Sequence, residues 1–231
     1  MQQITIEGIS SVVNQQEVEL AIGALERGDL TLLKGDIGYG LLGSAEQAIK
    51  KMYEAKGRSL SNPCIVIGNR DILEDVAVVP DAKIGGWIDK TMRYTTLATV
   101  LPVNPKSRLL KPLSPWLYGQ TVTNATIAVF LNVGPFLEEV ITQAASRGLI
   151  VVGSSANPSS HGNIYSFDEI PEALRSAADF WIDHGRCKYE NEERKATTIV
   201  NFTNWSIKRR GVNWEQIEPS FLALKSEIAS A

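Results

Sequence analysis

The glycine-rich stretch Lys34–Gly43, KGDIGYGLLG, combines backbone freedom with a lysine, an aspartate and a tyrosine. Four glycines within nine positions indicate a backbone that turns sharply or lets a ligand come close. The apolar run before it, Leu30–Leu33, is typical of a strand, and the segment after it is typical of a helix. Because the free N–H groups in the first turn of a helix attract anions, this order predicts a site for phosphate or carboxylate.

Three interpretations of the glycines are open at this point. Gly38, Gly40 and Gly43 fit the dinucleotide-binding pattern G-x-G-x-x-G, but the next predicted strand ends in Gly68 and Asn69 instead of the acidic residue expected there. A P-loop is excluded because no Gly-Lys-Ser or Gly-Lys-Thr follows. The third interpretation is a tight turn between strand and helix that holds no ligand.

Apolar periodicity and capping residues predict the elements that must position this stretch. Asn14 with Glu17 indicates a capping box for a helix that ends at Gly28, and Ser44 with Gln47 indicates the cap of a second helix. Further helices are predicted over 135–148, after the capping box of Ser166 and Glu169, and along the tail after Gln216. Strands are predicted at 64–68, 96–103, 124–131, the start of 149–162, 196–202 and 205–211.

The order of these elements and the composition limit the class of protein. Strands and helices alternate early and strands cluster later, which indicates an α/β or α+β domain with a mixed sheet. The chain has 231 residues and a net charge of −3, enough for one large domain whose surface as a whole does not attract nucleic acid. Two cysteines, no signal-like start and no long apolar run predict a soluble cytoplasmic protein without membrane contact.

Five motifs occur in a characteristic order: KGDIGYGLLG, KMYEAKGRSLSNPCIVIGN, VVGSSANPSSHG, ATTIVNF and IKRRG. Together they resemble the YrdC/Sua5/YciO family, whose best-known members are threonylcarbamoyl-AMP synthases. The resemblance covers about residues 15–212. The matching residues are Asp36, Tyr39, Gly40 and Leu41; Lys56, Arg58, Asn62 and Pro63; Ser155, Ala156 and Asn157; Thr198; and Arg209 with Gly211.

The resemblance implies a YrdC/RibB-like α/β fold, a twisted open mixed β-sheet with flanking helices and a large concave cavity. It implies a single YrdC-like domain over residues 1–231, with a core at about 15–212 and a tail at 213–231. It also implies a nucleotidyltransferase that uses ATP and bicarbonate to make L-threonylcarbamoyladenylate for the tRNA threonylcarbamoyladenosine pathway. Mg²⁺ is then expected on the phosphates of ATP, with no metal ligands from the protein.

By the same resemblance, four residues are expected to be catalytic: Lys56, Arg58, Ser155 and Asn157. These four, together with Thr198 and Arg209, are expected to bind the phosphates of ATP. Lysine offers a mobile point charge and arginine a rigid fork suited to phosphate, while serine and asparagine offer neutral donors. Such groups stabilise the negative charge that spreads over phosphate oxygens in a transition state of phosphoryl transfer.

The part of the site that would select threonine departs from the family pattern at four places. Lys34-Gly35 stands for Pro-Thr, Ile37 for a second threonine, Tyr94–Ala98 for Pro-Gly-Pro-x-Thr, and Phe130 for an arginine. We therefore expect the acceptor to be bound by Lys34, Asp36 and Tyr39. The acceptor is either L-threonine or another amino acid or amine.

Ordinary structural roles compete with these assignments. Lys56 and Arg58 suit the end of a helix, where cations favour the dipole. Ser155–Asn157 suits a polar turn before Pro158, and Lys34 suits the solvated end of a strand.

A basic patch offers a different function. Lys208–Arg210 with Lys106, Arg108 and Lys111 could form one, and family members have been linked to double-stranded RNA and to tRNA. The alternative function is therefore a non-catalytic nucleotide- or double-stranded-RNA-binding protein.

Overall fold

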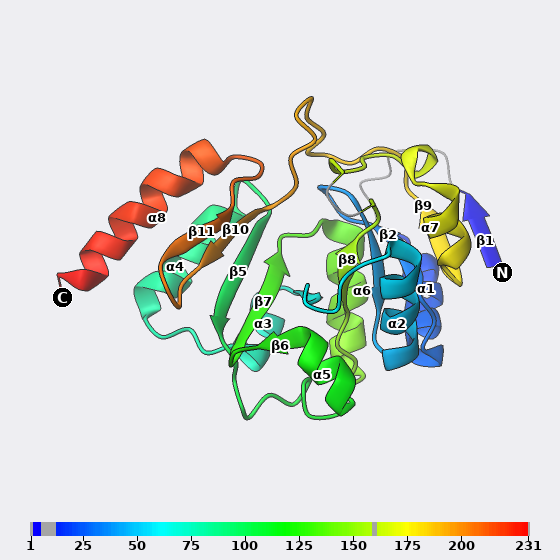
Figure 1. Cartoon of the computed structure of the whole chain (residues 1–231), viewed down its shortest axis with the longest axis horizontal. Coiled ribbons are helices and arrows are strands. Elements are labelled where there is room, and N and C mark those ends of the chain that lie inside the picture. Colours follow the sequence, from blue (N-terminus) through cyan, green and yellow to red (C-terminus); the bar gives the residue numbers. More distant parts are fainter. Residues whose placement is uncertain (1, 6–12, 159–160, 231) are drawn as a thin grey trace.

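The computed structural model describes residues 2–5, 13–158 and 161–230, and within these ranges eleven strands form one mixed sheet (Figure 1). The strand order is β1-β9-β2-β3-β8-β4-β7-β5-β10-β11, and β6 pairs with β7 beside this path. The strands are β1 (Gln2–Thr5), β2 (Thr31–Lys34), β3 (Tyr39–Gly43), β4 (Ile65–Ile67), β5 (Leu97–Pro102), β6 (Val122–Thr123), β7 (Thr126–Leu131), β8 (Val152–Ser155), β9 (Phe180–Asp183), β10 (Thr198–Asn201) and β11 (Ser206–Arg209).

The sheet is mixed because it contains both parallel and antiparallel strand pairs. The strand pairs β1–β9, β9–β2, β4–β7 and β5–β10 are parallel, and the other pairs are antiparallel. Strands far apart in the chain meet side by side, as β10 does with β5. The expected mixed-sheet architecture is confirmed.

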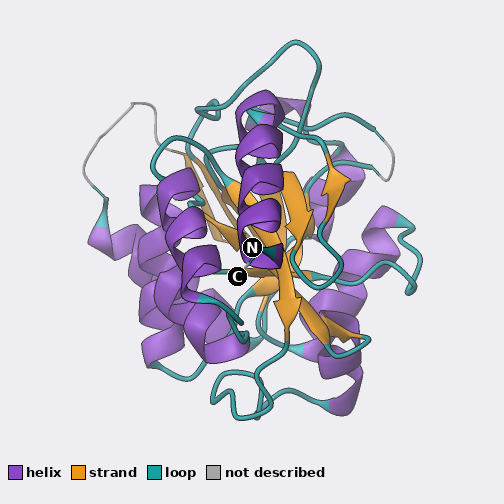
Figure 2. Cartoon of the chain, turned by 90° about the vertical axis from the view of Figure 1, so that its left-hand side faces the viewer, coloured by secondary structure: helices purple, strands orange, loops and turns teal. Residues whose placement is uncertain are grey.

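Helices cover the sheet on both sides (Figure 2). Helix α1 packs on α6, α2 packs on α5 and α7, and α4 packs on α8. The helices are α1 (Gln15–Arg27), α2 (Glu46–Lys56), α3 (Arg70–Val76), α4 (Ala82–Met92), α5 (Pro115–Thr121), α6 (Pro135–Ser146), α7 (Glu172–Ala177) and α8 (Trp214–Ala229), with a 3₁₀ turn at Phe167–Glu169. Among the described residues, every helix is too short or too polar to cross a lipid bilayer.

The caps of helix α1 confirm one sequence prediction and correct another. The Asn14 side chain accepts a hydrogen bond from the Gln16 backbone N–H at 3.0 Å, and Gly28 ends the helix at a φ of 79°. The predicted capping box is wrong in its second half. The Glu17 carboxylate lies 3.0 Å from the His184 ring instead, because the loop after β9 brings that ring onto the first turn of α1.

The glycine-rich stretch is a β-hairpin, not a strand followed by a helix. Strand β2 pairs antiparallel with β3, with Lys34 opposite Tyr39, and the glycine pattern continues inside β3. Helix α2 begins only after it, without a side-chain cap, because the Ser44 hydroxyl donates to the Leu25 carbonyl at 2.6 Å. The intervening strand therefore removes the predicted anion site between loop and helix N-terminus, and with it the dinucleotide-binding interpretation.

The capping box predicted at Ser166 and Glu169 is also wrong. Only a 3₁₀ turn forms there, and helix α7 begins after Pro171. The Glu169 carboxylate binds Arg194 at 3.0 Å instead. The tail helix is confirmed, but it is not merely a surface element, since Ile217 and Phe221 are fully buried.

Strand β7 shows how the sheet creates two different faces. Ile127, Val129 and Leu131 are buried in the core, whereas Ala128 and Phe130 between them are half-buried on the other face. Side chains alternate between the faces of a strand, so one face of the central strands packs in the core and the other is left open. That open face is where the cavity lies.

Candidate functional site

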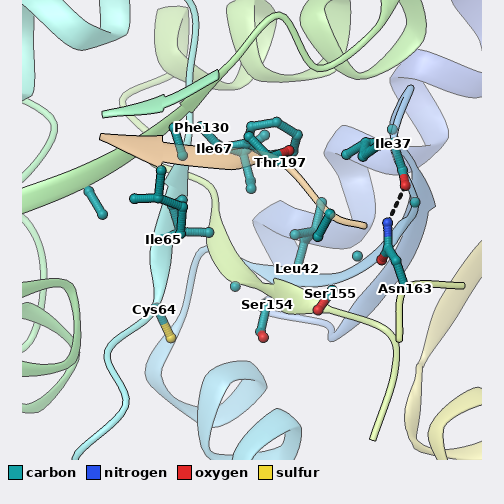
Figure 3. Close-up of a pocket in the computed structure, with 18 of the residues that line it drawn as sticks. Ile37, Leu42, Cys64, Ile65, Ile67, Phe130, Ser154, Ser155, Asn163 and Thr197 are labelled. Carbon is teal, nitrogen blue, oxygen red and sulfur yellow. Dashed lines mark hydrogen bonds between the residues drawn. The ribbon is translucent and has the colours of Figure 1, made fainter. Parts of the chain in front are cut away.

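The cavity has a volume of about 300 Å³ and lies on the open face of the central strands. Pairs of residues two positions apart line it, as Ala128 with Phe130 and Thr197 with Ile199 do. Its apolar base, here called the floor, consists of Ile65, Ile67, Ala98, Val100, Ala128, Phe130 and Ile199. Figure 3 shows Ile37 and Asn163 on one side of the cavity, joined by a hydrogen bond from the Asn163 amide to the Ile37 carbonyl.

Three cations line the cavity, and we call Arg58, Lys208 and Arg209 the cationic rim. None of the described lining residues is acidic. Within residues 13–158 and 161–230, no carboxylate forms an ion pair with the rim or with the neighbouring Lys56. Cations without a carboxylate partner create a positive potential in a partly enclosed space, so the cavity favours an anionic ligand.

Lys56 is the last residue of helix α2 and is 8% exposed. Its Nζ donates a hydrogen bond to the carbonyl of Ser155, at the end of β8. Burial, with a smaller contribution from the positive charge of Arg58, lowers the pKa of Lys56 to about 8. An anion in the cavity would stabilise the charged form of this buried ammonium group, because the attraction between them would offset the cost of desolvation.

Arg58 follows a left-handed turn at Gly57, whose φ of 53° suits glycine and ends helix α2. The guanidinium donates to the Asn62 carbonyl at 3.2 Å and to the Pro63 carbonyl at 3.0 Å, and it lies 5.9 Å from the Tyr53 ring centre. These contacts hold the planar group in one orientation at the cavity. Of the predicted neighbours, Arg58 thus lines the cavity, whereas Lys56 contacts the lining residue Ser155 and is not itself a lining residue.

Ser155 lines the cavity, and Asn157 stands behind it. The Ser155 hydroxyl donates to the Asn157 side-chain oxygen, and the Asn157 amide donates to the His161 carbonyl at 2.6 Å. The structure therefore brings Lys56, Arg58 and Ser155 together, while Asn157 orients Ser155 and does not itself line the cavity.

The structure places Thr198 away from the cavity. Its side chain is fully buried, and its hydroxyl donates to the Val212 carbonyl and accepts from the Gly211 N–H, both at 2.9 Å. Thr197 is the residue of this pair that lines the cavity. Thr197 directly precedes the first residue of β10, and consecutive side chains of an extended backbone point to opposite sides. The residue at the cavity is therefore the neighbour of the one that was predicted to contact phosphate. The other predicted residue of this wall, Arg209, does line the cavity and donates to the Thr197 carbonyl at 2.8 Å.

Replacing Thr198 with valine should lower the free energy of unfolding by about 1–3 kcal/mol, because two buried backbone groups lose their partner. Thr197→Val is the matched control, since its hydroxyl makes one contact of 3.2 Å with Thr96, and it should cost clearly less. Urea unfolding of both variants compares them. Equal losses of stability would contradict this assignment of the two faces.

The three predicted acceptor-binding residues are not brought together at the cavity. The Lys34 ammonium donates to the carbonyls of His184, at 2.7 Å, and Arg186, at 3.1 Å. Tyr39 lines the cavity with its ring, but its hydroxyl lies 3.0 Å from an Asp183 carboxylate oxygen. Neither Lys34 nor Asp36 is among the lining residues, so the expected contact of these two with an acceptor is not supported.

Asp36 has a partner of its own outside the cavity. Its carboxylate lies 3.7 Å from the Lys188 ammonium, and burial raises the pKa of Asp36 although Lys188 and Lys34 act against this. The hairpin residues Lys34, Asp36 and Tyr39 thus all bind the loop that follows β9. Their role in the structure is to hold that loop against the hairpin.

Sequence reasoning missed Thr197, Asn163 and the place of Lys208 at the cavity. Asn163 reaches the Ile37 carbonyl across 126 positions of the chain, and no local pattern signals such a contact. For Thr197 the alternation of strand residues was the available signal. It could not be read because the run 196–202 has apolar or threonine residues on both faces.

Comparison with known proteins identifies the family of this chain. The family model Sua5_yciO_yrdC, described as "Telomere recombination", matches residues 23–211. This chain belongs to the Sua5/YciO/YrdC family. The match confirms the resemblance read from the five motifs, and it includes every lining residue of the cavity. A search of curated proteins found no match.

Several solved structures share the fold of this chain. P. abyssi Sua5, crystallised with L-threonine, has a TM-score of 0.71 and 23% identity, over 90% of this chain and 58% of that chain. A hypothetical protein, smu.1377c from Streptococcus mutans UA159, has a TM-score of 0.71 and 16% identity, over 97% of this chain and 93% of that chain. E. coli YciO has a TM-score of 0.69 and 16% identity, over 86% of this chain and 91% of that chain. The chain thus spans less than three fifths of the Sua5 length.

Proposed function

We propose that this protein is an ATP- and bicarbonate-dependent carbamoyl-adenylate synthase, a nucleotidyltransferase of the threonylcarbamoyl-AMP synthase type. The observation that carries the proposal is the cationic rim, which has no carboxylate partner among the described residues and lines one cavity with Ser155, whose carbonyl accepts a hydrogen bond from Lys56. Membership of the Sua5/YciO/YrdC family supports the reaction type. The crystallisation of P. abyssi Sua5 with L-threonine supports an amino acid as acceptor.

The proposed reaction has two bond-forming steps. The acceptor amine attacks the carbon of bicarbonate, water leaves, and a carbamate remains. A carbamate oxygen then attacks the α-phosphorus of ATP. The bond between the α-phosphorus and the oxygen that bridges to the β-phosphate breaks, and pyrophosphate leaves. Both steps need positioned charges more than a covalent intermediate on the protein.

The cavity residues fit the charge that develops in these steps. Hydrogen bonds to two backbone carbonyls fix the plane of the Arg58 guanidinium. Its remaining N–H groups could donate two parallel hydrogen bonds to a phosphate. Lys56 keeps donors free beyond its bond to the Ser155 carbonyl, because an ammonium carries three. Lys208 and Arg209 would contact the phosphates from the opposite wall, since β11 lies at the far edge of the sheet from the β3–β8 pair.

The cavity fits a nucleotide that brings its own divalent ion. No carboxylate occurs among the described lining residues, so Mg²⁺ would be coordinated by phosphate oxygens and water instead of by protein side chains. When bound, this ion would neutralise part of the charge on the leaving pyrophosphate.

The test is pyrophosphate release from ATP with Mg²⁺ and bicarbonate, with L-threonine and a panel of amino acids and amines as acceptors. Arg58→Gln should reduce kcat/KM by about 10²-fold or more, because one fixed phosphate donor is lost. Arg93→Gln is the matched control, since Arg93 is an exposed arginine at the end of α4 that does not line the cavity. No release with any acceptor would refute the synthase, and ATP or double-stranded-RNA binding without release would favour a binding protein.

A further inference from the structure

The floor of the cavity is continuous across four strands. In strand register, Ile67 stands beside Phe130, Phe130 beside Ala98, and Ala98 beside Ile199. The same row ends at Arg209 of the cationic rim, which pairs with Ile199. A second row lies two residues further along β5 and β7, where Val100 pairs with Ala128. Figure 3 shows Ile65, Ile67 and Phe130 lying together, away from Ile37 and Asn163.

The floor offers no hydrogen-bond partner to a ligand. All seven of its side chains are aliphatic or phenyl groups, and their backbone groups lie in the paired central strands of the sheet. Of the neighbouring polar groups that line the cavity, the Asn163 amide binds the Ile37 carbonyl and the Thr197 hydroxyl lies 3.2 Å from that of Thr96. The Cys64 thiol lies 3.6 Å from the Tyr53 hydroxyl. The Ser154 and Ser155 hydroxyls also line the cavity, but they belong to β8 and not to the floor. From the seven side chains of the floor itself, a hydroxyl group would therefore gain no partner for the water it loses.

The two ends of this surface select different parts of the substrates. We expect phosphates at the cationic rim, because the rim holds the cations among the described lining residues. A nucleobase could place only its apolar ring face on the floor, and the ring nitrogens and amino group along its edges would gain no partner from the floor side chains. An aliphatic side chain has no such requirement and gains from leaving water.

We propose that the floor binds the side chain of the acceptor, and that the acceptor is an amino acid with a branched apolar side chain, not one with a hydroxyl group. This inference rests on the proposed synthase function and names the substrate class for it. The half-buried Phe130 forms the middle of the binding surface, and the small, half-buried Ala128 on the same strand leaves room for a branched group.

Valine and threonine test this directly, because they have the same shape and differ by a methyl group in place of a hydroxyl. Pyrophosphate release by the full chain, with ATP, Mg²⁺ and bicarbonate, should show a kcat/KM for L-valine roughly 10- to 100-fold above that for L-threonine, the range expected of an apolar pocket. A higher value for threonine would overturn the inference while leaving the synthase function in place. Absence of release with every acceptor would overturn both.

A substitution in the floor separates the acceptor from the nucleotide. Val100→Thr keeps the volume and adds a hydroxyl to the floor, so it should shift the ratio toward threonine by about tenfold while the affinity for ATP stays unchanged. Val78→Thr is the control, since Val78 is 43% exposed and lies outside the cavity. An unchanged ratio combined with weaker ATP binding would mean that the floor holds the nucleobase, and it would overturn the inference.

Discussion

Replacing Lys56 with methionine is expected to lower kcat/KM for pyrophosphate release by about 10²- to 10³-fold, as the loss of a positioned donor to a developing anion typically does. Methionine matches the length of the lysine and suits its buried position, so the fold should survive. Lys111→Met is the control, because Lys111 is exposed and does not line the cavity. Activity close to that of the unaltered protein would exclude Lys56 from the chemistry.

The same substitution should make the protein more stable at pH 7. Burial lowers the pKa of Lys56 from an ordinary value of 10.5 to about 8, so the folded protein holds this proton less tightly than the unfolded chain does. That difference corresponds to on the order of 3 kcal/mol. The lost hydrogen bond to Ser155 offsets about 1 kcal/mol, which leaves a net gain of about 2 kcal/mol.

The pH dependence has a definite sign. Between pH 8 and 10.5 the unfolded chain binds more protons at Lys56 than the folded protein, so the contribution of this group to stability rises with pH in that window. Below pH 8 the destabilisation is fully present. Urea unfolding at several pH values should therefore show the advantage of Lys56→Met shrinking as the pH rises from 8 to 10.5, and a constant advantage would show that charge burial is not its cause. Activity that needs the ammonium form should fall above about pH 8.

Gly211→Ala is expected to destabilise the fold by about 3 kcal/mol, the upper range for a forced contact in a packed region. A Cβ atom at Gly211 would lie 2.0 Å from the Ala196 carbonyl oxygen and 2.6 Å from the Thr198 backbone nitrogen. Neither backbone atom can move without displacing β10, which pairs with both β5 and β11. For a chain of 231 residues this loss corresponds to a drop in Tm of roughly 6–12 °C.

The matched control for this variant is Gly86→Ala in helix α4. A Cβ atom there meets nothing within 4 Å, so the substitution should raise the free energy of unfolding by about 0.5–1 kcal/mol through helix propensity. Thermal unfolding of both variants provides the comparison. Should Gly211→Ala unfold at the same temperature as Gly86→Ala, the close packing of β10 on the segment after β11 would be refuted. Ligand binding should weaken with Gly211→Ala, because Ala196 and Thr197 line the cavity.

Local signals in the sequence were enough for the elements that depend on neighbouring residues. The Asn14 cap and the left-handed Gly28 act within a few positions of α1, so both ends of that helix were predictable. The buried strands β4, β5 and β7 lie inside the runs predicted for them, because a fully or alternately apolar run needs no partner to be recognised. The motifs also sufficed to identify the family. The functional roles predicted for Lys56, Arg58 and Ser155 stay predictions.

What the tertiary structure decided depends on residues far apart in the chain. Strand β3 pairs with the nearby β2 on one side, but its second partner, β8, begins more than a hundred positions later. Without that second pairing the glycine-rich run up to Leu41–Leu42 suits a turn as well as a strand. Only the register of β10 on β5 decides that Thr197, and not Thr198, lines the cavity. The contacts of Lys34 with the loop after β9 and the apolar floor of the cavity also depend on distant pairing. Both form only once strands that are far apart in the chain lie side by side.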